Sequence, residues 1–324
     1  MAKGQGRARG LVMAGNQWFT SYLLDALGRA GMAPELLINV DSALAKGTSG
    51  YMDLAPQAQS LCVDIYRPSS FLLDSAEDRS ALGDREIQAL LVFGWHRLIP
   101  EWLLEHCAQG AYGVHGGPKA PPRCRGRAVF NWALILGCTQ FSMYLFQLTP
   151  RPDDGRLVDM TSFDLLPEDD IASVYNKNCV VTKRMVLHHL PAILKGTAKL
   201  RSQPPGEPSY LPGRKPEEGG IDWRQSARRI ADLVRAIAPP YQGAFTSLGD
   251  MRIELQRANV FDTLIEFEAE PGTIVEVFPA GEFVVAAGEH TVYVREYECE
   301  DRSLITPGER LRPVSGVQPP DPVL

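Results

Sequence analysis

Residues 112–117 read Tyr-Gly-Val-His-Gly-Gly and decide how this chain can fold. A short apolar strand, 110–115, ends there on a single histidine, His115, and the loop 118–127 that follows is too rich in Gly and Pro to be helical. An acidic pair lies on a second tight turn, Pro-Asp-Asp-Gly at 152–155. A histidine at a strand end with an acidic turn further along is the layout of a strand-end catalytic site in an α/β protein.

Working outward from this stretch, apolar strands alternate with amphipathic helices up to about residue 200. Strands are predicted at 9–15, 35–39, 89–93, 110–115, 140–148 and 155–160. Helices are predicted at 18–30, 100–109, 128–136 and 169–194. The alternation predicts a Rossmann-like, doubly wound α/β domain over residues 1–202, which would be the catalytic domain.

The composition then changes. Residues 203–222 are rich in Pro and Gly and are predicted to form a linker. Asp222 can cap a helix over 224–238, and the remainder of the C-terminal domain, 223–324, carries short strands at regular spacing. These strands, at 252–256, 264–268, 272–277, 283–287 and 291–296, predict a small OB-like β-barrel.

The overall composition excludes several classes of protein. The chain has 324 residues and a formal charge of −6, which argues against nucleic acid as a partner because phosphate binding needs a concentrated basic face. No run is long and apolar enough for a membrane span, and the N-terminus is not a secretory signal, so a cytoplasmic location is expected. The six cysteines show no CxxC or CxH spacing, so we expect buried free thiols and no metal site. Oligomeric state is not predictable from these features.

Residues 110–137 and 147–158 together resemble the folate-dependent formyltransferases. That family's pattern is Asn-x-His-Gly-Ser-Leu-Leu-Pro, then Arg-Gly, then an Asp-x-Gly turn. The similarity continues in order, with family spacing, through 167–171, 188–193, 214–216, 221–223, 233–236, 243–245, 271–273 and 287–288. The resemblance therefore covers nearly the whole chain. It implies an enzyme with the fold of the methionyl-tRNA formyltransferases.

Within the family the chain is most similar to the amino-sugar-nucleotide N-formyltransferases. The formyltransferase that acts on UDP-4-amino-4-deoxy-L-arabinose is the nearest pattern, on Arg-Gly-Arg-Ala at 125–128, Asn-Trp at 131–132 and Asp-Trp at 222–223. The tRNA enzymes carry a basic insertion after the second strand, whereas 41–54 here holds Lys46 as its single cation. The resemblance implies a small-molecule amine as substrate, an amino sugar nucleotide or another amine metabolite.

By this resemblance, the reaction is attack of a primary amine on the formyl carbon of 10-formyltetrahydrofolate. His115 matches the catalytic histidine that relays a proton, and Asp153 matches the acid that orients it and stabilises its charged form. Asp154 is one residue out of register and is expected to solvate the turn. The pterin would be held by the loop after the third predicted strand and by the acidic turn, through Phe93, Gly94, Trp95, His96, Leu98, Arg151 and Pro152.

Four further residues are candidates for binding the acceptor: Asn16, Lys119, Arg123 and Arg125. Asn16 follows the first strand and could touch the amine, although a tight strand-to-helix turn explains it equally well. The arginines of the loop, Arg127 included, could meet a phosphate or carboxylate, or could simply be solvated.

One residue departs from the family pattern. The family asparagine, which supplies a side-chain donor to the developing oxyanion, is Gly113 here. Losing one such donor can cost about 100- to 1000-fold in rate. The adjacent loop, 116–124, is also longer than usual, so Lys119, Arg123 or a backbone N–H freed at Gly113 or Gly117 could take over the role. Alternatively the chemistry has changed, to hydrolysis of the formyl donor or another reaction, or the chain binds ligands without catalysis.

Overall fold

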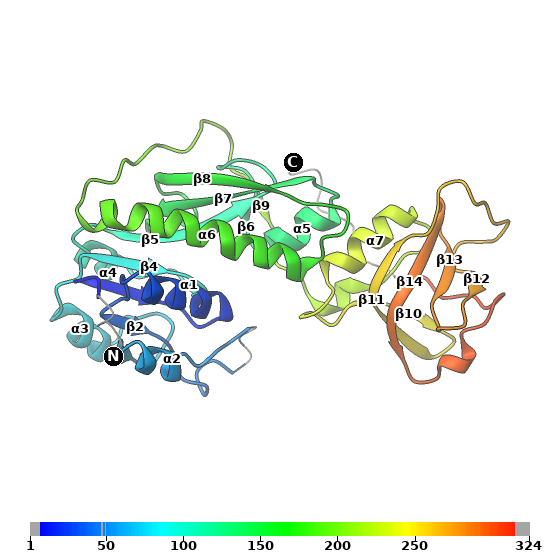
Figure 1. The fold of residues 1–324 in the computed structure, drawn as a ribbon, viewed down its shortest axis with the longest axis horizontal. Helices are drawn as coiled ribbons and strands as arrows, with labels where there is room; N and C mark the ends of the chain where they lie inside the picture. Colours follow the sequence, from blue (N-terminus) through cyan, green and yellow to red (C-terminus); the bar gives the residue numbers. More distant parts are fainter. Residues whose placement is uncertain (1–6, 47, 49, 315–324) are drawn as a thin grey trace.

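A seven-stranded mixed sheet with the order β3-β2-β1-β4-β5-β7-β8 forms the core of the N-terminal lobe in the computed structural model, which describes residues 7–46, 48 and 50–314 (Figure 1). The first five strands in this order are parallel, β7 runs antiparallel to β5, and β8 runs antiparallel to β7. The strands are β1 (Leu11–Ala14), β2 (Leu36–Ile38), β3 (Asp64–Tyr66), β4 (Ala89–Val92), β5 (Ala111–Gly117), β7 (Gln140–Gln147) and β8 (Leu157–Asp164).

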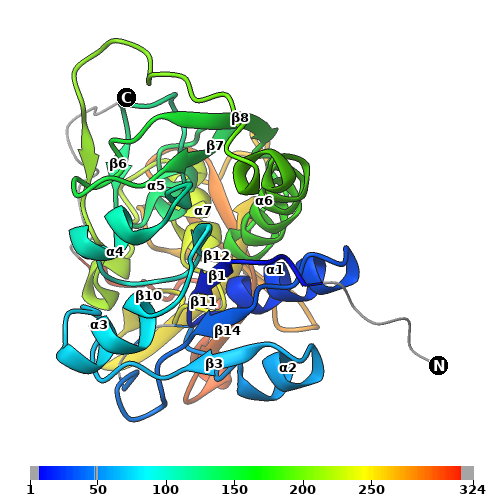
Figure 2. The same cartoon turned by 90° about the vertical axis from the view of Figure 1, so that its left-hand side faces the viewer.

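Helices cover both faces of this sheet, as Figures 1 and 2 show. One face carries α1 (Trp18–Arg29), α2 (Ala55–Ser60), α5 (Val129–Ile135) and α6 (Ile171–Leu194), and the other carries α3 (Ala76–Gly83) and α4 (Glu101–His106). The alternation of β1 explains the arrangement, because Leu11 and Met13 pack on the first group while Val12 and Ala14 pack on the second. The predicted doubly wound α/β domain is confirmed.

The strand order reverses between β1 and β4, so the loops that follow their carboxyl ends diverge and leave a crevice. Gly15 directly follows β1. A Cβ at this position would lie 2.1 Å from the carbonyl oxygen of Phe93, so only glycine fits. The loops after β4 and β5, and the turn between β7 and β8, meet at this edge of the sheet.

The Pro-rich segment is anchored to the N-terminal lobe. Its strand β9 (Tyr210–Leu211) pairs in parallel with β6 (Arg125–Gly126), which belongs to the loop after His115. Gly126 has φ +106°, and a Cβ there would lie 2.3 Å from the carbonyl oxygen of Leu211. The Arg-Gly motif is thus the point where the segment crosses the loop after His115, before the 3-10 helix η1 (Pro216–Gly219).

The C-terminal lobe is an antiparallel five-stranded sheet with the order β10-β11-β14-β13-β12. Bridges from Arg310 to Thr273 and from Arg312 to Ser247 join its two edges, as a barrel requires. Helix α7 packs against both α5 and β11 and connects the lobes (Figure 1). The elements are α7 (Ala227–Ala236), β10 (Ala244–Leu248), β11 (Met251–Val260), β12 (Ile274–Val277), β13 (Phe283–Ala286), β14 (Thr291–Cys299) and the 3-10 helix η2 (Arg302–Leu304).

Two local predictions in this lobe are wrong. Asp222 does not cap α7, because its carboxylate accepts hydrogen bonds from the backbone and side chain of Arg224, and Ser226 is the cap. No strand forms at 264–268, because Asp262 Oδ1 accepts the N–H groups of Leu264 and Ile265 and closes a turn.

In the described part of the chain, none of the helices combines the length and apolar character needed to cross a membrane. The cysteines differ in exposure: Cys107, Cys124 and Cys179 are buried, whereas Cys62 is exposed. The expectation of uniformly buried thiols is therefore wrong at Cys62.

Candidate active site

His115 lies near the end of β5 with its ring almost entirely buried; the side chain is 14% exposed. The ring hydrogen-bonds to the backbone of Cys124, while its Nε2 has no hydrogen-bond partner among the described residues. The bond to Cys124 is therefore made by Nδ1, which acts as the donor. This assigns the Nδ1–H tautomer and leaves the lone pair of Nε2 free to accept a proton.

The surroundings keep this imidazole neutral. Burial lowers the pKa of His115 below its ordinary value, and the nearby Arg125 acts in the same direction. The carboxylate of Asp153 and the Cys124 backbone oppose the lowering of this pKa but do not cancel it. His115 is therefore a base, rather than an acid, at neutral pH.

Asp153 faces that base from the turn between β7 and β8. Its Oδ2 lies 3.7 Å from His115 Nε2, close enough for charge stabilisation but long for a direct hydrogen bond. The backbone of Asp153 is left-handed, with φ +53°, and Gln203 Nε2 donates to the carbonyl oxygens of Asp153 (2.8 Å) and Gly155 (3.0 Å). A Cβ on Gly155 would lie 1.5 Å from the carbonyl oxygen of Gln147, which explains the glycine of the Asp-x-Gly turn.

Asp154 does more than solvate the turn, contrary to the prediction. It lies 2.6 Å from Arg151 Nε and 3.5 Å from Arg125 Nη2. Because Arg125 is buried and also donates to Gln203 Oε1 (2.8 Å), these contacts lock the turn against β6 and the Pro-rich segment. The two acids therefore divide the work: Asp153 faces the histidine, and Asp154 fixes the turn that holds it.

A groove of about 540 Å³ opens beside this pair, and we call it the Trp95 groove. Six of the seven residues predicted to hold the pterin line it, Trp95 and Pro152 among them. Phe93 does not, because it is buried in the core. The full lining is Val92, Gly94, Trp95, His96, Arg97, Leu98, Ile99, Gly113, Val114, Arg127, Phe146, Leu148, Thr149, Arg151, Pro152 and Asp153.

The Trp95 groove carries more positive than negative charge, with Arg97, Arg127 and Arg151 against Asp153. His96 adds no charge at neutral pH, because burial, followed by Arg97 and Arg127, lowers its pKa. An anionic ligand is thus favoured in this groove.

Gly113 also lines the Trp95 groove, on the same face of β5 as His115. A Cβ at this position would lie 3.0 Å from Leu148 Cδ2 and 3.4 Å from the carbonyl oxygen of Val92, and Phe146 lies opposite on β7. The side chains nearest to this position are therefore apolar, and the carbonyl oxygen of Val92 is the polar atom beside it. Lys119 and Arg123, weighed as replacements, are exposed and line none of the described grooves.

A second groove, also of about 540 Å³, lies across the acidic turn, and we call it the Arg156 groove. It is lined by Pro122, Arg125, Arg151, Pro152, Asp154, Gly155, Arg156, residues 202–206, Pro208 and Tyr210. The two grooves share Arg151 and Pro152, so the Asp153 turn forms the wall between them. Among the predicted acceptor-binding residues, Arg125 is thus placed here.

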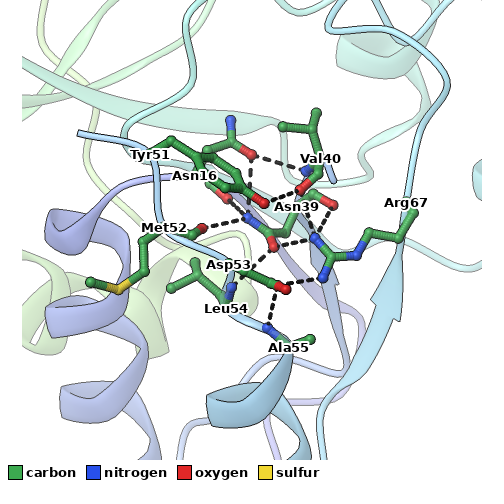
Figure 3. A network of polar contacts seen from close by, with 10 residues as sticks. Asn16, Asn39, Val40, Tyr51, Met52, Asp53, Leu54, Ala55 and Arg67 are labelled. Carbon is green, nitrogen blue, oxygen red and sulfur yellow. Dashed lines mark hydrogen bonds and ion pairs between the residues drawn. The ribbon is translucent and has the colours of Figure 1, made fainter. Parts of the chain in front are cut away.

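Asn16 is buried in a polar network that Figure 3 shows. Its Oδ1 accepts hydrogen bonds from Val40 N (3.0 Å) and Asn39 Nδ2 (3.3 Å). Arg67 in turn holds Asn39 and Asp53. The network ties the chain after β2 to the end of β1, so the structure gives Asn16 a role in positioning a loop and does not bring it to His115.

Sequence reasoning missed Tyr144 and Gln203. Tyr144 is the residue directly opposite His115 in β7, and the ring centroids are 5.7 Å apart in an edge-on arrangement. A buried aromatic residue in an alternating strand looks like core, so the pattern carried no signal for it. Gln203 sits in a Pro-rich stretch whose path could be known only from the strand pairing of β9 with β6.

Comparison with known proteins agrees with this architecture. Residues 214–312 match the formyl transferase C-terminal domain. An N-formyltransferase from Helicobacter canadensis, solved with folinic acid and dTDP-3-aminofucose, is 14% identical with a TM-score of 0.65, over 89% of this chain and 99% of that one. The sugar 3N-formyltransferase WlaRD, solved with dTDP and 5-N-formyl-THF, is also 14% identical, with a TM-score of 0.63 over 89% and 97%.

HypX from Aquifex aeolicus in complex with tetrahydrofolic acid is 15% identical, with a TM-score of 0.60. The match covers 89% of this chain but 43% of HypX, so the chain spans less than half the length of that protein. At these identities the structural matches establish the fold. Together with the domain match over residues 214–312, they show that the chain has the formyltransferase fold.

Proposed function

We propose that the protein is an N-formyltransferase that moves a formyl group from 10-formyltetrahydrofolate to the primary amine of a small molecule. The observation that carries this proposal is the free lone pair of His115 Nε2, held neutral by burial and facing Asp153 at 3.7 Å. A neutral imidazole beside a carboxylate can take a proton from an attacking amine and be stabilised once it is charged.

The Trp95 groove fits the donor. Its volume of about 540 Å³ is within the range of small-molecule sites, and its three arginines suit the carboxylates of a folate. The ring of Trp95 and the backbone of 94–99 offer a flat apolar wall and hydrogen-bonding groups for a pterin. When bound, 10-formyltetrahydrofolate supplies the electrophilic formyl carbon. The Helicobacter enzyme and WlaRD were solved with formylated folates, and HypX with tetrahydrofolic acid.

The residues of this chain then supply a base and its counter-charge. His115 accepts the amine proton at Nε2, and the resulting imidazolium, which faces Asp153 Oδ2, can return that proton to the nitrogen that leaves the formyl carbon. Gln203 holds the backbone of the turn and Arg125 pairs with Asp154, so the carboxylate of Asp153 needs little rearrangement to meet the new charge.

The Arg156 groove is the proposed entry for the acceptor. It adjoins the Asp153 turn on the side away from the donor groove, and Arg125, Arg151 and Arg156 outnumber the one acid, Asp154. This charge favours an amine that also carries phosphate or carboxylate, which a nucleotide-linked amino sugar does. The Helicobacter neighbour was solved with such a molecule, dTDP-3-aminofucose.

The test is to incubate the protein with 10-formyltetrahydrofolate, with and without a panel of amines, and to follow the folate products by mass spectrometry. Tetrahydrofolate that forms only with an amine supports transfer. Loss of the donor at a rate no amine changes indicates hydrolysis, the alternative raised by Gly113. No folate binding and no turnover would refute the proposal.

A further inference from the structure

Three of the buried side-chain polar atoms without a hydrogen-bond partner in the described part of the chain lie at one place: His115 Nε2, Tyr144 Oη and Arg125 Nε. Burying such a group without a partner is costly, so its presence in a folded protein calls for an explanation. A concentration of three such atoms around the proposed base points to a site for a polar ligand.

The geometry brings these groups together from different elements. His115 on β5 and Tyr144 on β7 are direct cross-strand partners, so their side chains leave the sheet on the same face. Asp153 lies 3.7 Å from His115 Nε2, and the charges of Asp153 and Arg125 act on both the imidazole and the phenol. Outside this set of four groups, the backbone of Cys124 anchors the other ring nitrogen of His115.

The hydrogen-bonding capacities of the four groups are complementary. Arg125 Nε–H can only donate, and Asp153 Oδ2 and the lone pair of His115 Nε2 can only accept. The Tyr144 hydroxyl can do either. A single water molecule among them would accept from Arg125 and Tyr144 and donate to His115 and Asp153, which uses its full capacity of four hydrogen bonds.

We propose that these residues form a buried water site. We also propose that Tyr144 is a positioning residue for His115, because its hydroxyl fixes the water molecule that passes a proton to Nε2. The Tyr144 hydroxyl can rotate away and free one lone pair of the water oxygen. A proton that binds there releases a water proton onto Nε2, so one proton moves and the water is unchanged. Asp153 also lines the Trp95 groove, so the water site adjoins the groove in which the formyl donor would bind. The catalytic role of the relay rests on the proposed formyl transfer, but the water site does not.

The expected result of Tyr144→Phe follows from this assignment, because the change keeps the ring and removes only the hydroxyl. We expect kcat to fall about tenfold with KM for the donor unchanged, the effect of losing one hydrogen bond in the transition state. We expect Tm to fall by about 2–4 °C. If the Tyr144 hydroxyl had no hydrogen-bond partner, Tm would rise instead, because the variant would remove a buried unsatisfied polar group.

The matched control is Tyr112→Phe. Tyr112 is buried on the neighbouring strand, its hydroxyl donates to the carbonyl oxygen of Gln109, and it packs in the core on the other face of the sheet. This variant should also lose stability but keep its kcat.

The deciding experiment is a high-resolution crystal structure of the wild type and of Tyr144→Phe, alongside thermal unfolding of both. The proposal predicts one water within hydrogen-bond distance of Tyr144 Oη and His115 Nε2 in the wild type, displaced or lost in the variant, with a lowered Tm. A wild-type structure without that water, or a raised Tm in the variant, would overturn it. Neither readout depends on formyl transfer, so failure of the proposed function would be seen separately.

Discussion

The two cross-strand pairs at the end of β5 face the same side of the sheet but differ in chemistry. Gly113 lies opposite Phe146, with Leu148 beside it, and this pair is apolar. His115 lies opposite Tyr144, and both rings end in buried polar atoms. In this chain the polar side chains at this end of β5 therefore belong to one cross-strand pair, His115 and Tyr144. The family pattern instead has an asparagine at position 113 and a histidine at position 115.

The largest expected effect comes from His115→Gln, which keeps a polar side chain of similar size. Removing the base should lower kcat for formyl transfer by about 10²–10⁴-fold, the usual contribution of general acid–base catalysis. Tetrahydrofolate release at saturating donor measures it. Folate binding and Tm should stay near wild-type values, and a variant with full activity would show that the polar pair is not the centre of the reaction.

Asp153→Asn should have the next largest effect, about 10²-fold in kcat, because the imidazolium loses its counter-charge. The change also has a signature in pH. The pKa of His115 lies below its ordinary value of 6.5, so activity is present at pH 7 and is lost as pH falls through that lowered pKa. Asp153 raises this pKa, so removing its charge lowers the pKa further and moves the acid limb to lower pH.

The measurement is the pH dependence of kcat/KM for the wild type and the variant. An acid limb that stays in place, or moves to higher pH, would mean that Asp153 does not act on His115.

Gln203→Ala tests how far the polar pair depends on the turn that faces it. The variant loses the hydrogen bonds to Asp153 O, Gly155 O and Arg125, which should lower the free energy of unfolding by about 1–3 kcal/mol. We expect a reduction of kcat smaller than that of Asp153→Asn. Denaturant titration and the transfer assay measure the two effects. Gln242→Ala, at an exposed position, is the control and should change neither.

Gly113→Asn should have the smallest effect. If the site merely lacks the hydrogen-bond donor to the oxyanion, restoring the amide would raise the rate of formyl transfer by up to about 100- to 1000-fold, the contribution of one such donor. We expect kcat to change by less than about threefold, which is small on that scale. The reason is that the polar partners of His115 lie on β7 and on the turn, and that the new Cβ would lie 3.0 Å from Leu148. Steady-state kinetics of the variant decide, and a large gain would show that the apolar pair marks an impaired site.

Much of this site could be predicted from the sequence because its residues carry local signals. His115 lies near the end of a strand and 94–98 follow another, so the topology of a doubly wound sheet places these two at one edge. Asp153 sits on an Asp-x-Gly turn after the antiparallel strand β7, and the pairing of β7 with β5 brings that turn to the same place. The short elements β3 and α2 were missed because they bury few residues and have weak periodicity.

What could not be predicted depends on contacts between segments far apart in the chain. Tyr144 lies beside His115 only because of the register between β7 and β5, and Gln203 reaches the Asp153 turn only because β9 pairs with β6. For Asn16 the sequence left a ligand contact and a tight strand-to-helix turn equally open, and its hydrogen-bond partners in the loop are visible only in the structure (Figure 3).

The most direct test of the central claim is to supply 10-formyltetrahydrofolate labelled with ¹³C in the formyl group, together with the amine panel, and to follow the label by NMR. The account predicts that the label appears in an N-formyl amide only when an amine is present, and that His115→Gln suppresses its appearance. Label found only in free formate, at a rate that no amine changes, or transfer unaffected by His115→Gln, would contradict it.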